Sequence, residues 1–154
     1  MIRKVGNIIY HVSAGGYVLH NNKILMIKNY YHGGIIPAHG HVEKGESNLD
    51  AAKREICEET GYCDLRVIKK LGKAQYEYVS GKTKNKKTEY RWLFELRSVQ
   101  RKPKLDNNES KQLENRWYTI DGAIRAASFE NAKSDLVEIK QFLARYRHKN
   151  RKEK

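Results

Sequence analysis

The segment over residues 40–62, GHVEKGESNLDAAKREICEETGY, places the strongest constraint on the fold of this chain. Ser47 is a suitable helix N-cap, because its hydroxyl can accept a hydrogen bond from a free amide of the first turn. Gly61 is a suitable C-cap, because glycine readily adopts the left-handed conformation that often ends a helix. Three apolar residues of the intervening helix would share one face: Leu49, Ala52 and Ile56. The segment therefore predicts a loop, a helix packed against a sheet, and a second loop.

Three acidic residues share another face of this predicted helix. Glu55, Glu58 and Glu59 stand at positions i, i+3 and i+4, which are neighbours on a helix surface. Their charges repel one another, and a hard divalent cation, which prefers oxygen ligands, would remove that repulsion. Runs of charge are also common on ordinary solvated helix faces, so these acids by themselves leave that interpretation open.

Residues around the acids could hold them in place. An ion pair between Arg54 and Glu46, eight residues earlier, would tie the preceding loop to the helix. Gly40 and Gly45 would let that loop bend tightly and bring backbone groups close to a metal or a phosphate.

The rest of the chain is predicted to be a single domain of strands and helices. The predicted strands are residues 11–20, 23–28, 65–78, 88–96 and 116–120. A Gly-rich loop over 30–45 is broken by Ile35-Ile36, and a lysine-rich turn covers 81–87. Asp121 would cap a short helix that runs through Ala127, and a final helix would run from about Asn131 to Tyr146. This order predicts an α/β domain over residues 1–146, with helices on both faces of a sheet, and a basic tail over 147–154.

The net charge of +13 favours polyanionic partners such as nucleotides, polyphosphate, RNA or acidic lipid surfaces. Part of this charge can equally be solvated surface. No apolar run approaches the roughly 20 residues that span a bilayer. The N-terminus lacks the features of a signal peptide, so we expect a cytoplasmic protein with no membrane partner. Cys57 and Cys63 show no metal or redox spacing and are predicted to be reduced thiols.

Residues 40–61 follow a longer pattern. It reads Gly40, five residues, Glu46, seven residues, Arg54-Glu55, aliphatic Ile56, one residue, Glu58-Glu59, one residue and Gly61. Every fixed position matches the box of the Nudix hydrolases, and the chain resembles that family from about Ser13 to Leu143. The resemblance implies a Nudix-type α/β/α sandwich with a mixed β-sheet. It also implies hydrolysis of nucleoside diphosphates linked to another group X, with Mg²⁺ or Mn²⁺ as cofactor.

The resemblance also implies roles for individual residues. Glu55 and Glu59 would be the principal metal ligands, and Glu58 would be a further ligand or a base. The backbone carbonyl of His39 would complete the ligands, although the loop between Pro37 and the first box glycine is one residue longer than in most relatives. The orienting residues would be Glu46 and Arg54.

The implied mechanism is attack of water on phosphorus, with a carboxylate accepting the proton. That carboxylate could belong to the box or to a later loop, where Glu109 and Glu114 are the candidates. Many relatives place a mobile glutamate six residues before the tryptophan, where this chain has Lys111. Glu109 is the nearest substitute, or else it is a solvated side chain.

The substrate is suggested by a narrower resemblance. Tyr76-Glu77, Lys87-Thr88 and Trp92-Leu93 resemble the diadenosine tetraphosphate hydrolase branch of the family. In that branch an aromatic residue of this strand region stacks on adenine and basic residues contact the polyphosphate. Tyr76 and Lys87 are therefore the candidate substrate-binding residues, with His41 as a further polar candidate. Tyr76 could instead pack in the core, as strand tyrosines often do.

Two other functions remain open. The chain could hydrolyse ordinary or oxidised nucleoside triphosphates, because the box is common to both activities. It could also be a catalytically silent domain that binds nucleotide or RNA through its basic surface, although such a domain would not need all three box glutamates. A nucleotide or a dinucleoside polyphosphate is thus the expected partner, RNA is a possible one, and the oligomeric state is not predicted.

Overall fold

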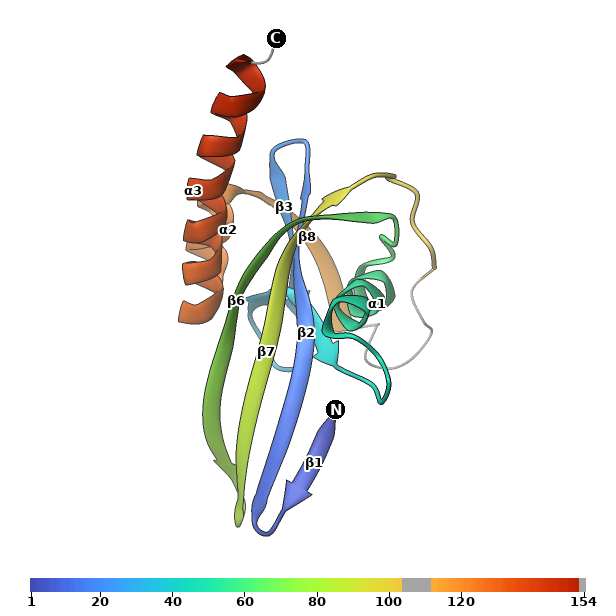
Figure 1. Ribbon diagram of the computed structural model, residues 1–154, viewed down its shortest axis with the longest axis vertical. Helices are drawn as coiled ribbons and strands as arrows, with labels where there is room; N and C mark the ends of the chain where they lie inside the picture. The colour runs from blue at the N-terminus through green and yellow to red at the C-terminus, as the bar shows by residue number, and fades with distance from the viewer. Residues whose placement is uncertain (104–111, 153–154) are drawn as a thin grey trace.

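The computed structural model describes residues 1–103 and 112–152, which form one eight-stranded mixed sheet with helices on both sides (Figure 1). The strands are β1 (Ile2–Val5), β2 (Ile8–His20), β3 (Lys23–Asn29), β4 (Ile35–Ile36), β5 (Ala38–His41), β6 (Leu65–Ser80), β7 (Thr83–Leu96) and β8 (Leu113–Thr119). The helices are α1 (Asn48–Thr60), α2 (Ile120–Ala126) and α3 (Glu130–Lys152). No helix within the described ranges is long and apolar enough to cross a membrane.

The long strand β2 organises the sheet. One edge of β2 pairs in parallel with β7, and its other edge pairs in turn with β1, β5 and β3, all antiparallel. Antiparallel β6 continues the sheet beyond β7, whereas β4 and β8 both pair with β3. The parallel pair requires a crossover connection, and this connection contains α1. The predicted mixed sheet is confirmed.

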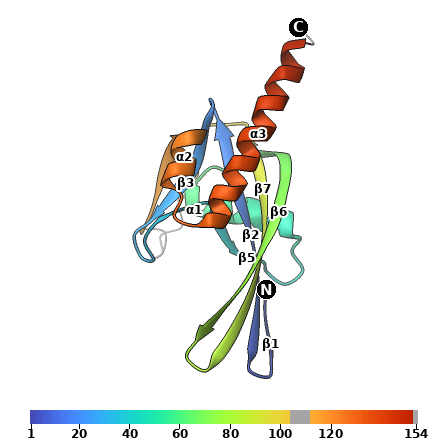
Figure 2. The same ribbon diagram turned by 90° about the vertical axis from the view of Figure 1, so that its left-hand side faces the viewer.

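Both faces of the sheet are covered, as Figure 2 shows from a second direction. Alternate residues of the central strands point to opposite faces, as the period of two in a strand requires. Toward α1 the buried core includes Val18, Phe94 and Ile56. Toward α2 and α3 it includes Tyr17, Leu93 and Leu136. The prediction of helices on both faces is therefore confirmed.

The predicted caps of α1 are present. Ser47 Oγ accepts a hydrogen bond of 3.1 Å from the Asp50 amide, and Gly61 ends the helix with a φ of 82°. The prediction that Asp121 caps α2 was wrong, because Thr119 occupies the N-cap position of this helix. Thr119 Oγ1 accepts from the Gly122 amide at 3.1 Å.

Two predicted loops were wrong in their extent. Of the supposed turn over 81–87, only Gly81 and Lys82 lie between strands, and β7 begins at Thr83. Lysines are tolerated in this hairpin because Glu77 on β6 faces them, at 2.6 Å from Lys84 Nζ and 2.9 Å from Lys86 Nζ. In the predicted loop over 30–45, the pair Ile35-Ile36 that breaks it forms the short strand β4, and the strand β5 was not expected.

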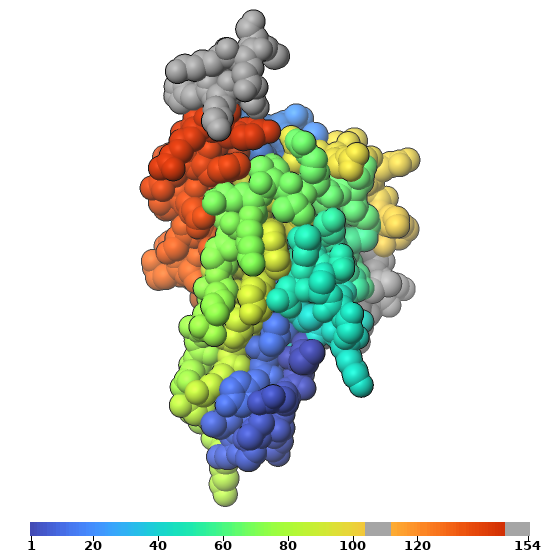
Figure 3. Space-filling model, viewed as in Figure 1, coloured from blue at the N-terminus to red at the C-terminus, as the bar shows by residue number. Residues whose placement is uncertain are grey.

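Both ends of the chain carry more regular structure than predicted. Strand β1 was not expected, and its hairpin with β2 projects beside the β6–β7 hairpin at the lower end of the molecule (Figure 3). The final helix does not end near Tyr146, because α3 continues to Lys152 and takes in much of the supposed tail.

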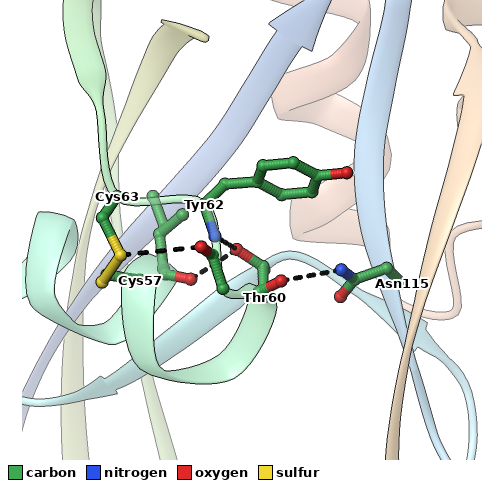
Figure 4. Close-up of a disulfide and its surroundings, with 7 residues drawn as sticks. Cys57, Thr60, Tyr62, Cys63 and Asn115 are labelled. Carbon is green, nitrogen blue, oxygen red and sulfur yellow. Dashed lines mark hydrogen bonds between the residues drawn. A yellow bond between two sulfur atoms is a disulfide. The ribbon is translucent and has the colours of Figure 1, made fainter. Parts of the chain in front are cut away.

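The cysteines are not reduced thiols: Cys57 and Cys63 form a disulfide at the end of α1 (Figure 4). Gly61 turns the chain back on the last helical turn and leaves the two Cα atoms 4.5 Å apart. The prediction failed because sequence spacing does not reveal this reversal. The same helix end is held by Asn115 of β8, whose Nδ2 donates to the Thr60 carbonyl at 2.9 Å.

Loss of the disulfide should destabilise the fold modestly. Cys63→Ser frees a short loop in the unfolded chain, and loop-closure entropy then predicts a loss of about 2 kcal/mol in the free energy of unfolding. Urea unfolding with and without a thiol reductant measures this. The reductant should destabilise the wild type and leave Cys63→Ser unchanged. Equal unfolding free energies for oxidised wild type and the variant would contradict the expectation.

Candidate active site

The guanidinium of Arg54 lies at the centre of the predicted acidic site. Its Nε and Nη2 donate to the two carboxylate oxygens of Glu46 at 2.8 and 3.0 Å, which is the pair expected between loop and helix. Nη1 donates to Glu55 Oε1 at 2.7 Å and to Glu58 Oε2 at 3.2 Å. Nη2 also donates to the backbone carbonyl of His41 at 2.9 Å. One arginine thus ties α1 to the preceding loop and to β5.

The carboxylates around Arg54 are in different electrostatic states. The hydrogen bonds from Arg54 lower the pKa of Glu46, so this side chain stays ionised. Burial raises the pKa of Glu55, and the negative charge of Glu58 acts in the same direction, while Arg54 only partly offsets both. A bound cation would therefore stabilise the charged form of Glu55.

Strand β5 packs closely against the acidic face of α1. A Cβ on Gly40 would lie 2.2 Å from Glu55 Oε2, so any larger residue here would force the Glu55 carboxylate out of its present position. The backbone amide of His39 donates to Glu59 Oε2 at 3.1 Å. The first glycine of the pattern is therefore needed to admit the Glu55 carboxylate, and the strand before the helix orients Glu59.

These residues have the right donor chemistry for a divalent metal. Glu55, Glu58 and Glu59 offer only oxygen atoms, as Mg²⁺ and Mn²⁺ prefer. Within the described ranges, no three His, Cys, Asp or Glu side chains already converge on one point as a metal site. Two of these acids, Glu55 and Glu58, are instead held by hydrogen bonds from Arg54. A cation would compete with Arg54 for these oxygens.

A cavity of about 1310 Å³ opens beside the acids. Glu55, Glu59 and His39 line it, and so do the predicted substrate-binding residues Tyr76 and Lys87. His41 and Phe129 line it as well. The chain folds so that residues of β5, α1, β6 and β7 face one common space, which is large enough to take a nucleotide.

Glu109 and Glu114 were the two later-loop candidates for the base that accepts the water proton. Glu109 lies outside the described residues. Glu114 lies in β8, where its carboxylate accepts from Arg116 Nε at 2.9 Å and from the Tyr30 hydroxyl at 2.5 Å. Glu114 is thus an exposed ion-pair residue of the sheet edge.

A second charged cluster was missed by sequence reasoning. Glu89 of β7 is buried and accepts hydrogen bonds through Oε1 from Lys87 Nζ at 2.8 Å and from the Tyr76 hydroxyl at 2.9 Å. The ring of His39 is 3.6 Å away. Burial alone would raise the pKa of Glu89, but His39 and Lys87 outweigh it and the pKa lies below its usual value. The sequence did contain a signal for this cluster, because Lys87 and Glu89 are two residues apart on one strand and therefore share a face.

Two residues farther along β7, Arg91 forms a buried ion pair with Asp135 of α3. Arg91 Nη2 donates to Asp135 Oδ1 at 3.0 Å, Nε donates to Oδ2, and the Tyr17 hydroxyl donates to Oδ2 at 2.9 Å. Arg91 and Tyr17 also line the cavity. This pair anchors α3 to the centre of the sheet, and nothing in the sequence spacing links Arg91 to Asp135.

Gly40→Ala should weaken divalent-metal binding, because its Cβ would displace the Glu55 carboxylate. We expect the Kd for Mn²⁺ to rise about 10- to 100-fold, the range seen when groups supporting metal ligands are changed. Gly72→Ala is a matched control, because a Cβ there meets nothing within 4 Å. Calorimetric titration with Mn²⁺ measures both. An unchanged Kd in a folded Gly40→Ala protein would exclude Glu55 from the metal site.

The chain is similar in sequence to a known family and to individual proteins of known or probable activity. A family model of the NUDIX domain matches residues 9–139. The bis(5′-nucleosyl)-tetraphosphatase (asymmetrical) of Rattus norvegicus is 35% identical over 108 residues, which cover 70% of this chain and 70% of that protein. A probable DHNTP pyrophosphohydrolase of Lactococcus lactis is 34% identical over 89 residues, covering 55% of this chain and 54% of that protein.

The fold is shared with solved structures. A crystal structure of the Ap4A hydrolase of C. elegans superposes with a TM-score of 0.63 at 24% identity, covering 86% of this chain and 98% of that one. A binary complex of a C. elegans Ap4A hydrolase gives 0.67 at 23% identity, covering 87% and 98%. The match to the family model, the box and the architecture agree, and the chain belongs to the Nudix family.

Proposed function

We propose that this protein hydrolyses dinucleoside polyphosphates of the diadenosine tetraphosphate type, with Mg²⁺ or Mn²⁺. The observation that carries the proposal is the composition of one cavity. The acids Glu55 and Glu59 line it together with an aromatic residue and a cation, Tyr76 and Lys87. The similarity to the tetraphosphatase of Rattus norvegicus supports the same substrate class.

The box residues would hold the metal and position it. Glu55 and Glu59 would be the principal ligands, with the His39 carbonyl beside them and Glu58 as a further ligand or base. The bound metal would neutralise charge on phosphate oxygens and lower the pKa of a coordinated water. Arg54 would keep the acids oriented through its bond to Glu46.

The chemical step would be an in-line displacement. A water oxygen bonds to phosphorus as the bridging P–O bond breaks, and the leaving phosphate carries away the bonding electrons. The water proton goes to a carboxylate, for which Glu58 and Glu109 are the candidates. Glu58 is part-buried beside Arg54, and Glu109 lies outside the described residues.

Tyr76 and Lys87 would bind the substrate. The Tyr76 side chain is not part of the core, because it is 40% exposed and lines the cavity, so one face can accept a base. Lys87 Nζ lies 5.9 Å from the centre of the Tyr76 ring, so both side chains could contact the same end of a bound nucleotide. Burial and Lys87 lower the pKa of His41, so at neutral pH this side chain would contribute a neutral polar contact.

Hydrolysis of nucleoside triphosphates is the second candidate. The similarity to the probable DHNTP pyrophosphohydrolase of Lactococcus lactis favours it over other members of the family. A screen with Mg²⁺ over dinucleoside polyphosphates, nucleoside triphosphates, nucleotide sugars and triphosphorylated RNA separates the two. The highest kcat/KM should be for a dinucleoside polyphosphate. A higher value for nucleoside triphosphates would reverse the assignment, and no turnover with any substrate would favour a binding domain.

Glu59→Gln should reduce kcat by at least about 100-fold, because the neutral amide is a poor ligand for a hard cation. The fold should be intact, as judged by circular dichroism and thermal unfolding. Glu138→Gln is the matched control and should retain full activity, because Glu138 of α3 pairs with Lys69 of β6 and does not line the cavity. A Glu59→Gln enzyme with wild-type kcat would remove Glu59 from the metal site.

A further inference from the structure

One nitrogen of the Arg91 guanidinium, Nη1, is a buried donor whose hydrogen bonds are not satisfied by the described residues. Its Nε and Nη2 bind Asp135, but Nη1 is buried and has no hydrogen-bond partner among the described residues. The Arg91 side chain is only 8% exposed, and the residue lines the cavity. A buried charged donor without a partner is costly, so an acceptor supplied by a ligand would be strongly favoured here.

An acceptor lies beside this donor. Glu89 Oε2 is 3.9 Å from Arg91 Nη1, which is too long for a hydrogen bond. The bonds that Glu89 accepts from Lys87 and Tyr76 both go to the other oxygen, Oε1. Glu89 also lines the cavity. The cavity wall therefore presents a charged donor next to a charged acceptor.

Ser13 adds a third polar group to this wall. It lies directly across from Glu89 in the parallel pairing of β2 with β7. Its hydroxyl is buried without a hydrogen-bond partner, and the residue lines the cavity. Two of the three buried side-chain polar atoms without a partner in the described residues thus belong to this one wall.

The charges here favour a neutral polar ligand group over a phosphate. Asp135 neutralises Arg91, and Lys87 neutralises Glu89. The Glu89 carboxylate, 3.9 Å from Arg91 Nη1, would repel a phosphate placed on that donor. A group that carries its own acceptor next to its own donor meets no such repulsion and satisfies both protein groups.

We propose that Arg91 and Glu89, with Ser13, form a subsite that reads the polar edge of the adenine in the proposed diadenosine-type substrate. The 6-amino group of adenine would donate to Glu89, and a ring nitrogen beside it would accept from Arg91 Nη1. The tyrosine bonded to Glu89, Tyr76, supplies an aromatic surface on the same cavity. This subsite rests on the proposed substrate, which supplies adenine as the base, and it adds the protein groups that would recognise the 6-amino edge of that base.

The test compares ADP with purine riboside 5′-diphosphate, which lacks only the 6-amino group. Calorimetry without added divalent metal measures binding free of turnover. The wild type should bind ADP at least about tenfold tighter, as expected for a hydrogen bond to a buried charged group. In Glu89→Val the two affinities should become nearly equal. If Glu89→Val does not fold, Glu89→Gln should reduce the preference severalfold, because a neutral amide oxygen accepts more weakly.

A second variant tests the donor. Arg91→Lys keeps a cation facing Asp135 but removes Nη1, so it should weaken both ligands by a similar factor of about 10 and leave their ratio unchanged. Arg66→Lys is the matched control, because Arg66 is an exposed arginine paired with Glu95 on the same sheet. Its affinities should equal those of the wild type.

The outcomes separate this proposal from the proposed function. A wild type that hydrolyses dinucleoside polyphosphates but binds both diphosphates equally would overturn the subsite alone. So would a full ADP preference that survives in Glu89→Val. A tenfold preference in a protein that hydrolyses nothing would support the subsite and overturn the hydrolase. No ADP binding at all would overturn the subsite, and the hydrolysis screen with Mg²⁺ would then decide on the hydrolase separately.

Discussion

The hydrogen bonds of Arg54 are the contacts on which the acidic site depends. One guanidinium binds the loop before α1 through Glu46, two acids of α1 through Glu55 and Glu58, and β5 through the His41 carbonyl. Without that cation, the acids of the helix would repel each other across a single face. Arg54 thus holds in place a carboxylate cluster that would otherwise be unfavourable, and one acid of that cluster, Glu55, lines the cavity.

On the β7 wall of the cavity, in contrast, positive and negative side chains are paired with one another. Each buried charge there has an opposite partner: Glu89 with Lys87, and Arg91 with Asp135. Buried charges are tolerated when they are paired and hydrogen-bonded, so this wall can be polar without a net charge. The acids of α1 are suited to a cation, whereas the β7 wall is suited to a neutral polar group. Two such surfaces around one space fit a ligand that has both a phosphate chain and a base.

Local sequence signals predicted what depends on neighbours along the chain. Ser47 and Gly61 gave the limits of α1, and the spacing of Arg54 and Glu46 gave their ion pair, because caps and helix faces are local. Contacts that depend on the three-dimensional path of the chain were not predictable in this way. The pairing of Arg91 with Asp135 depends on where α3 crosses the sheet, and the Cys57–Cys63 disulfide depends on the chain reversal at Gly61. The lysines of residues 82–87 suggested a turn because charge alone does not reveal a partner strand, and Glu77 is that partner.

The most direct test of this account is the position of a metal in the protein. A crystal grown with Mn²⁺ and a non-hydrolysable dinucleoside tetraphosphate would locate the ion by its anomalous scattering. The account predicts Mn²⁺ bound by Glu55 and Glu59 next to the His39 carbonyl, with Arg54 still bonded to Glu46. Mn²⁺ bound elsewhere, with Glu55 and Glu59 making no contact to it, would contradict the account.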